Sequence, residues 1–167
     1  MDRLFTPWRL DYLTSTRSEE TCVFCGVFQT RKDADAYLLA RGEGSFVILN
    51  LFPYANGHLL VVANRHVGRL SDLTKEERQQ MMETVTRCEK VLRAAYQPDG
   101  MNLGLNMGKA AGAGIIGHLH IHLVPRWSGD TNFATVIGET RIIPETPSQT
   151  YERLLPFFAP NGAASQS

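Results

Sequence analysis

Three of the five histidines in the chain stand at alternate positions within residues 117–126. His118, His120 and His122 are separated by aliphatic residues, and this alternation predicts a β-strand because successive side chains point to opposite faces. We expect the imidazoles to line one face, about 6–7 Å apart, and the aliphatic side chains to enter a core. Imidazoles near neutral pH act as nucleophiles, proton carriers or metal ligands, so this row predicts a chemical site rather than three structural histidines.

Cys22 and Cys25 form a two-residue-spaced pair that suits either redox chemistry or half of a zinc site. The chain has no second such pair, so a zinc site would need two histidines from elsewhere. His66 and His118 are the candidates, and two thiolates with two imidazoles would make a closed tetrahedral structural site. The alternative is a pair of small buried thiols, and the residues alone leave both possibilities open.

Two further segments bring polar residues or glycines next to expected strands. Asn50 precedes a loop that ends in Gly57-His58; on residue type alone, Asn50 could be a turn residue and His58 a hydrogen-bonded core imidazole. Residues 108–117 are rich in glycine but lack the spacing of a P-loop or a dinucleotide-binding motif. Their backbone N–H groups could approach phosphate oxygens, or the segment could simply connect two antiparallel strands.

The elements that must position these residues follow from the hydrophobic pattern. Thr74 and Glu77 form a capping box, and apolar positions at helical spacing continue to Tyr96, which predicts an amphipathic helix across a sheet. A final short helix is expected over residues 148–158. Together the elements predict an α+β fold, a twisted, mostly antiparallel sheet of about five strands with one long helix. The expected strands span residues 36–41, 45–50, 58–62, 101–107 and 117–126, with two short ones at 134–138 and 141–143.

Length and composition restrict the class of protein. With 167 residues, 43% of them hydrophobic, the chain should form one domain with a sizeable core. A formal net charge of zero gives no basic surface for bulk nucleic-acid binding. No apolar run approaches the ~20 residues of a membrane span and the N-terminus lacks a signal-peptide core, so we expect a soluble, cytoplasmic protein without a membrane partner. The odd number of cysteines argues against a disulfide framework.

Residues 117–127 resemble the motif of the histidine-triad family of nucleotide hydrolases and transferases, in which histidine alternates with apolar residues. Hydrolase branches of the family usually carry Gly-Gln-Ser or Gly-Gln-Thr before the first histidine, whereas residues 112–117 here read Gly-Ala-Gly-Ile-Ile-Gly. The segments similar to the diadenosine tetraphosphate phosphorylase-like branch are this glutamine-free loop, the aromatic Pro7-Trp8-Arg9 segment, and residues 130–133 and 137–144.

The resemblance implies a role for each histidine of the segment. His120 would be the nucleophile, His122 would bind phosphoryl oxygens, and the backbone carbonyl of His118 would orient the nucleophile. By the same resemblance His58 would support the triad through hydrogen bonds, and Asn50 would bond to the ribose or base of the nucleotide. Asn106 matches the asparagine that the family usually has near the triad, while Gly112 and Gly114, from the glycine-rich loop, are candidates for the phosphate side through their backbone N–H groups.

The resemblance also implies a metal and partners. Family members with this cysteine pair hold a structural zinc ion, here with Cys22, Cys25, His66 and His118; the chemistry requires no catalytic metal, although magnesium could bind the polyphosphate substrate. The partners would be adenine nucleotides, inorganic phosphate and a second copy of the chain in an edge-to-edge homodimer. The expected organisation is an N-terminal aromatic arm (1–21), the histidine-triad domain (22–127), a C-terminal extension (128–159) and a disordered tail (160–167).

Three functions are compatible with these expectations. The first is phosphorolysis of diadenosine tetraphosphate to ATP and ADP, which the glutamine-free loop favours. The second is hydrolysis of dinucleoside polyphosphates or nucleoside phosphoramidates, with water as the acceptor. The third is a non-catalytic nucleotide-binding protein, against which the complete triad argues because a binder has no need of a nucleophile at His120.

Overall fold

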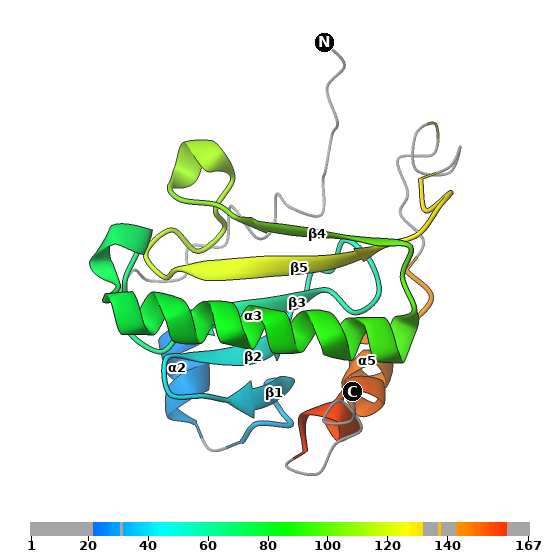
Figure 1. Ribbon diagram of the computed structural model, residues 1–167, viewed down its shortest axis with the longest axis horizontal. Coiled ribbons are helices and arrows are strands. Elements are labelled where there is room, and N and C mark those ends of the chain that lie inside the picture. Colours follow the sequence, from blue (N-terminus) through cyan, green and yellow to red (C-terminus); the bar gives the residue numbers. More distant parts are fainter. Residues whose placement is uncertain (1–21, 31, 132–136, 138–142, 160–167) are drawn as a thin grey trace.

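The computed structural model describes residues 22–30, 32–131, 137 and 143–159. At the centre of this part is a five-stranded antiparallel sheet in the order β1-β2-β3-β5-β4, crossed by the helix α3 (Lys75–Tyr96) (Figure 1). This arrangement confirms the α+β fold expected from the sequence. The strands are β1 (Leu38–Arg41), β2 (Ser45–Leu49), β3 (Leu59–Ala63), β4 (Gly100–Leu105) and β5 (His120–Arg126).

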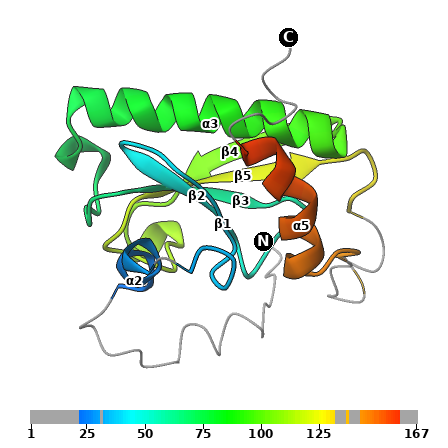
Figure 2. The same ribbon diagram turned by 90° about the horizontal axis from the view of Figure 1, so that it is seen from below.

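The inner strands β2 and β3 are largely apolar on both faces, and helices lie on both sides of the sheet. Every residue of β2 and β3 is buried, so these inner strands read as continuous apolar runs rather than as alternating ones. Val47 and Leu123 belong to the main core with α3, whereas Phe46 and Val62 pack in a second core with the short helix α2 (Val23–Gln29). Figure 2 shows α3 above the sheet and α2 below it.

The long helix has the start and end that its sequence predicts. The Thr74 hydroxyl accepts the Glu77 N–H at 3.1 Å, and the Glu77 carboxylate accepts the Thr74 N–H at 2.8 Å, which completes the capping box. Met81 and Cys88 lie on the buried face of α3. The helix ends at Gln97, whose left-handed backbone (φ 46°) turns the chain toward β4.

Strand β5 starts later than the alternation predicts, since His118 precedes the strand instead of belonging to it. Just before the strand, the Leu119 N–H donates to the Val67 carbonyl at 2.7 Å and the Leu119 carbonyl accepts the Ala63 N–H at 3.1 Å. The segment 63–67 therefore fixes the approach to β5, and it brings the His118 ring to 5.1 Å from the His66 ring. The other expected strands are present with ends that differ by up to two residues.

The C-terminal helix packs against both the sheet and the long helix. The helix α5 (Pro147–Phe158), expected over 148–158, packs on β1 through a hydrogen bond from the Tyr151 hydroxyl to the Leu38 carbonyl (3.3 Å). It also contacts α3, because Arg87 donates to the Phe158 carbonyl at 2.9 Å (Figure 2). The helix α2 is not predicted by the sequence. Two short 3₁₀ turns complete the described elements, η1 (Leu70–Asp72) and η2 (Lys109–Ala111).

Some sequence predictions fall outside the described residues. These are the N-terminal arm (1–21), the tail (160–167) and almost all positions of the short strands expected at 134–138 and 141–143. Among the helices that the structure describes, none combines the length and the apolar character needed to cross a bilayer.

Candidate active site and adjoining metal cluster

The alternating segment presents its two kinds of side chain to opposite faces, as its sequence predicts. The aliphatic residues Leu119, Ile121 and Leu123 are buried in the core with α3. His120 and His122 lie on the other face, with ring centroids 5.0 Å apart. Only 5% of His120 is exposed, whereas His122 is half-buried. The strand thus places a nearly enclosed imidazole beside one that a ligand can reach.

A hydrogen bond to the backbone determines which ring nitrogen of His120 carries the proton. Its Nδ1 lies 2.8 Å from the carbonyl oxygen of His118, and a carbonyl can only accept, so Nδ1 carries the proton. A neutral His120 therefore keeps the lone pair on Nε2. Burial lowers the pKa of His120 and outweighs the opposing effect of the His118 carbonyl, which favours this neutral form. The arrangement provides a nitrogen nucleophile at neutral pH.

A second chain of hydrogen bonds, here called the histidine relay, runs from the Tyr54 backbone through His58 to His122. The Tyr54 N–H donates to Nδ1 of His58 at 3.0 Å, so a neutral His58 carries its proton on Nε2. That Nε2 lies 2.9 Å from Nδ1 of His122 and donates to it. A neutral His122 must then carry its own proton on Nε2, where it can donate to a phosphoryl oxygen.

Asn50 lies beside this relay. Its side-chain oxygen accepts the Phe52 N–H at 3.0 Å, and its amide nitrogen lies 3.3 Å from Nδ1 of His58. The Tyr54 ring stacks nearly parallel to the His122 ring, 6.2 Å away with 14° between the planes. The structure thus brings Asn50 and His58 to the triad, while the contact of Asn50 with a ribose or base stays a prediction.

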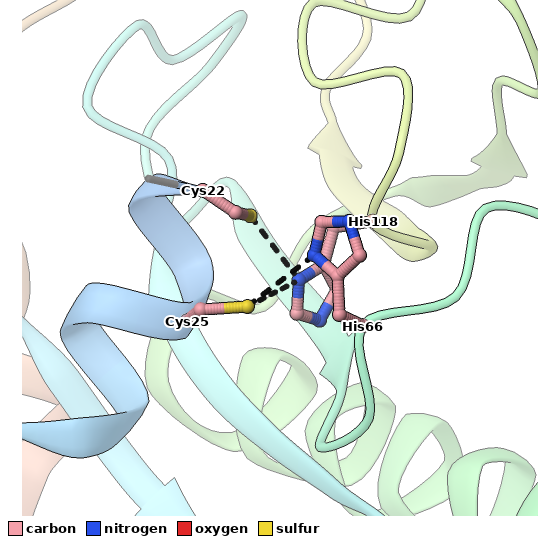
Figure 3. Close-up of side chains that lie close together, drawn as sticks. All are labelled: Cys22, Cys25, His66 and His118. Atoms are coloured by element: carbon pink, nitrogen blue, oxygen red, sulfur yellow. Dashed lines mark hydrogen bonds between the residues drawn. The ribbon is translucent and has the colours of Figure 1, made fainter. Parts of the chain in front are cut away.

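The four residues expected to bind a metal come together at the other side of His120. Figure 3 shows Cys22 and Cys25, at the start of α2, pointing toward the rings of His66 and His118. The Nδ1 of His118 lies 3.3 Å from the Cys22 sulfur and 3.6 Å from the Cys25 sulfur, and the Nδ1 of His66 lies 3.3 Å from the Cys25 sulfur. All four candidate ligand atoms lie within 4.8 Å of one another. We call these four residues the metal cluster.

The chemistry of the metal cluster fits zinc. Zinc–sulfur and zinc–nitrogen bonds of about 2.3 and 2.0 Å imply sulfur–nitrogen separations of about 3.5 Å in a tetrahedron, close to those observed. The Nε2 of His118 donates to the Ala63 carbonyl at 2.6 Å, which leaves the Nδ1 lone pair facing the thiols. Burial, and then the neighbouring Cys22, raise the pKa of Cys25, so a cation is needed to hold two thiolates together.

His118 therefore belongs to both halves of the site. Its ring faces the cysteines, and its backbone carbonyl accepts the proton-bearing Nδ1 of His120. Burial lowers the pKa of His118, with a smaller effect from His66, and a neutral ring is the form that ligates a metal. The expected roles of His118, as a metal ligand through its ring and as a partner of the nucleophile through its carbonyl, stay predictions.

The helix that carries the cysteines is held by residues that sequence reasoning missed. Arg41 donates to the carbonyls of Phe28 and Thr30, both at 2.7 Å, and pairs with Asp33 at 2.6 Å, which fixes the end of α2. Phe24, between the two cysteines, packs against the rings of His118 and His120. The one signal available in the sequence was the position of Phe24 inside the cysteine pair.

The glycine-rich loop is less clearly a phosphate site than expected. Gly112 has φ 84° and its N–H donates to the Lys109 carbonyl at 3.0 Å, so this N–H is engaged in the turn itself. Gly114 is exposed, and Asn106 is half-buried directly after β4. Contact of these residues with phosphate stays a prediction. Gly117 has a different role, because a Cβ there would lie 3.2 Å from Nε2 of His66.

Comparisons with known proteins agree with this site. The model of the HIT domain matches residues 31–129. An AP-4-A phosphorylase of Mycobacterium tuberculosis is 38% identical over 163 residues, covering 93% of this chain and 83% of that protein. A zinc-bound histidine triad family protein from Mycobacterium smegmatis is similar in structure, with a TM-score of 0.67 and 30% identity over 83% of this chain and 94% of that one.

A further relative matches a shorter part. A bis(5'-adenosyl)-triphosphatase of Dictyostelium discoideum is 39% identical over 84 residues, or 50% of this chain and 56% of that protein. The residues that the domain model matches include the histidine relay and His120, and the phosphorylase match extends over nearly the whole chain. The protein therefore belongs to the histidine-triad, or HIT, family.

Proposed function

We propose that the protein transfers a nucleotidyl group through His120, and that it cleaves diadenosine tetraphosphate with inorganic phosphate. The observation that carries this proposal is the buried His120, whose Nδ1 proton is committed to the His118 carbonyl at 2.8 Å so that Nε2 keeps its lone pair. In the first step Nε2 attacks the α-phosphorus, the bond to the bridging oxygen breaks, and ATP leaves. In the second step a phosphate oxygen attacks the same phosphorus, the phosphorus–nitrogen bond breaks, and ADP leaves.

The histidine relay supports the charge that develops during this transfer. Nucleotidyl transfer needs hydrogen-bond donors at the phosphoryl oxygens, because charge spreads over them in the transition state. His122 offers such a donor at Nε2, since its Nδ1 accepts from His58 at 2.9 Å. Because the backbone N–H of Tyr54 sets the tautomer of His58, the donor at His122 is prepared before the substrate arrives.

Two observations support inorganic phosphate as the acceptor and an adenine dinucleotide as the substrate. The relative that is 38% identical over most of this chain carries the name AP-4-A phosphorylase. The loop before the triad, residues 108–117, has no glutamine, which in the resemblance to hydrolase branches is the residue expected there. Magnesium would enter only as a companion of the polyphosphate substrate.

Product analysis tests this proposal. Purified protein is incubated with diadenosine tetraphosphate, with and without inorganic phosphate, and the products are separated by chromatography. ATP and ADP in equal amounts, formed only with phosphate, are the expected result. The His120→Ala variant should bind the nucleotide and release no product. Formation of ATP and AMP without phosphate would show that the protein is a hydrolase and not a phosphorylase.

Hydrolysis is the second candidate, and one comparison favours it. The Dictyostelium relative, 39% identical over half of this chain, is named a bis(5'-adenosyl)-triphosphatase. The same His120 chemistry would apply, with water as the attacking group in the second step. Diadenosine triphosphate should therefore be included as a substrate, and the dependence of the rate on phosphate separates the two reactions for both substrates.

We further propose that the metal cluster binds one zinc ion with a structural role. Two sulfur and two nitrogen ligands leave no open position in a tetrahedral site, which is typical of structural zinc. The similar protein from M. smegmatis is described as zinc-bound. Metal analysis of protein purified without chelator should give one zinc per chain, and the Cys25→Ser variant should give much less.

The homodimer expected from the sequence is proposed at the free edge of β4. This strand is the last in the sheet order, and Leu103 on it is 52% exposed. An unpaired strand edge offers backbone donors and acceptors to a second copy of the chain. Light scattering should give twice the chain mass of 18.6 kDa, and Leu103→Arg should shift the protein to the monomer.

A further inference from the structure

The Phe24 side chain lies between the metal cluster and the proposed nucleophile, His120. It stands between the ligands Cys22 and Cys25 in the sequence, and only 4% of it is exposed. Its ring packs edge-on against His118, with centroids 5.5 Å apart and 80° between the planes. It packs in the same manner against His120, at 5.1 Å and 61°. One aromatic side chain thus touches a metal-ligand candidate and the proposed nucleophile.

The position of Phe24 depends on contacts that α2 makes with the rest of the domain. The helix has seven residues, and a helix of this length is not stable by itself in water. At its far end Arg41 donates to the backbone carbonyls of Phe28 and Thr30. At its near end the two cysteines face His66 and His118. The first turn of α2, which carries Phe24, is therefore tied down through the metal cluster.

The contact with Phe24 restricts the ring of His120. The hydrogen bond from Nδ1 to the His118 carbonyl forms only when the imidazole lies in the plane that points Nδ1 at that oxygen. His120 has Phe24 on one side and the His122 ring, 5.0 Å away, on another. Without the Phe24 ring the imidazole gains space to rotate, and Nε2 no longer stays in line with the α-phosphorus.

We propose that Phe24 is a positioning residue for His120, and that metal binding by the cysteines on either side of it sets its place. The effect on catalysis rests on the nucleotidyl transfer proposed above. The effect on the imidazole does not, because the orientation and tautomer of His120 exist without substrate. The metal cluster then contributes to catalysis as well as to stability, because it keeps the His120 ring in its reactive orientation through the Phe24 ring.

The test compares Phe24→Leu and Phe24→Ala with the wild type, all saturated with zinc. Leucine keeps an apolar side chain in the second core but removes the ring, so this variant should fold. We expect kcat for diadenosine tetraphosphate to fall by about 10- to 100-fold, with KM changed by less than threefold, because the nucleophile is misplaced while the binding surface is intact. Side-chain nitrogen NMR should show a single Nδ1–H tautomer of His120 in the wild type and a mixture in both variants.

Phe28→Leu is the matched control. Phe28 lies on the same helix and stacks on the same Phe46 ring, at 5.3 Å, but its ring contacts are with Phe46 and Arg41 rather than with the histidines. Like Phe24→Leu, this variant removes an aromatic contact with Phe46; it should keep kcat within threefold of the wild type and keep a single His120 tautomer. A kcat loss equal to that of Phe24→Leu would mean that disturbance of α2 in general, not the Phe24 ring, is responsible, and would overturn the proposal.

Zinc removal completes the experiment. Chelation of the wild type should produce the same mixture of His120 tautomers as Phe24→Leu, and chelation of Phe24→Leu should add little further change. If Phe24→Leu with zinc bound keeps both the wild-type kcat and the single tautomer, Phe24 has no positioning role. A wild type without any nucleotidyl transfer would remove the proposed function, while the NMR comparison would still decide the role of Phe24.

Discussion

The two sides of His120 are built in different ways. The histidine relay combines a local contact with one across the sheet: Tyr54 lies four residues from His58, and the register of β3 with β5 places Leu60 opposite His122, which brings His58 to His122 over 64 positions. The metal cluster gathers its ligands from distant segments, with Cys22 and His118 separated by 96 positions. Sheet register fixes the relay, whereas the metal cluster depends on the packing of α2 against the rest of the domain. Damage to the cluster should therefore appear first as lost stability, and damage to the relay as lost turnover.

The largest effect is expected from Cys25→Ser at the metal cluster. This change removes one sulfur ligand and should abolish tight zinc binding. The free energy of unfolding should fall by about 3 kcal/mol and Tm by about 10 °C, as is typical for the loss of a structural metal from a domain of this size. Differential scanning calorimetry with metal analysis measures both quantities.

Cys88→Ala is the control for that substitution. Cys88 is fully buried in the core with α3, far from the cluster in the fold, and burial raises its pKa to about 12. The control should keep one zinc per chain, and thiol reagents should label Cys22 and Cys25 only after chelation, with Cys88 reacting only on unfolding. Equal loss of zinc in both variants would contradict the assignment of the ligands.

The next largest effect is expected from His58→Ala in the histidine relay. Without His58, no side chain of the relay donates to Nδ1 of His122. The His122 ring can then carry its proton on Nδ1, and in that tautomer Nε2 cannot donate to a phosphoryl oxygen. We expect kcat to fall by about 100-fold while zinc content stays at one per chain. The His58→Gln variant can still donate an amide N–H to Nδ1 of His122 and should recover part of the loss. Equal kcat for alanine and glutamine at this position would argue against the relay.

A smaller effect on the metal cluster is expected from Gly117→Ala. The added Cβ would lie 3.2 Å from Nε2 of His66, and a ring that ligates a metal has little freedom to move away. Zinc affinity should fall by about 10-fold, measured by competition with a chromophoric chelator. Gly100→Ala is the control, because a Cβ at Gly100 meets nothing within 4 Å, and its zinc affinity should equal that of the wild type.

The smallest effect is expected from Glu77→Gln, next to the segment that carries His66. Arg65 bonds to both carboxylate oxygens of Glu77, at 2.7 and 2.8 Å. The Arg65 hydrogen bond, and then that of the Thr74 N–H, lower the pKa of Glu77 from 4.5 to about 2. Because the folded pKa is depressed, the stabilisation is present above pH 4.5 and is lost as the pH falls toward 2.

This pH dependence can be measured on metal-free protein, so that protonation of the metal ligands does not contribute. The Tm difference between the wild type and Glu77→Gln should be about 2 °C at pH 7 and should shrink between pH 4.5 and 2. Turnover of zinc-saturated protein at pH 7 should be unchanged, since among the described residues the pair is hydrogen-bonded to Asp72 and Thr74 and not to His120 or the histidine relay. A Tm difference that grows on acidification would contradict the assignment.

The sequence predicted those parts of the fold that depend on periodic patterns. Alternation in residues 117–126 placed Leu123 in the core and His120 on the opposite face, and helical spacing after Thr74 defined α3. The cysteine pair was visible in the sequence, and the resemblance to the histidine-triad family implied His66 and His118 as the other two members of the metal cluster. In each of these cases the side chain itself carries the information.

The parts that could not be predicted depend on backbone groups and on tertiary contacts. The helix α2 is too short for a periodic signal and is stabilised by Arg41 and Phe46 from elsewhere in the chain. The Tyr54 N–H and the Ala63 carbonyl orient two histidines, but every residue other than proline offers the same groups. For the same reason, the engagement of the Gly112 N–H within its own turn had no sequence signal.

The distance along the chain between the metal ligands has a topological consequence. A cation held by Cys22 and His118 would tie together residues that enclose most of the described domain, including β1 to β4 and α3. It acts as a reversible cross-link, and in the chain-entropy view a link that closes a loop of roughly 100 residues is worth about 4–5 kcal/mol. A protease cut in the glycine-rich loop would leave two fragments joined by the pairing of β5 with β3 and β4 and, with the ion bound, by the metal as well. Release of the ion should then lower the denaturant concentration at which the two fragments separate.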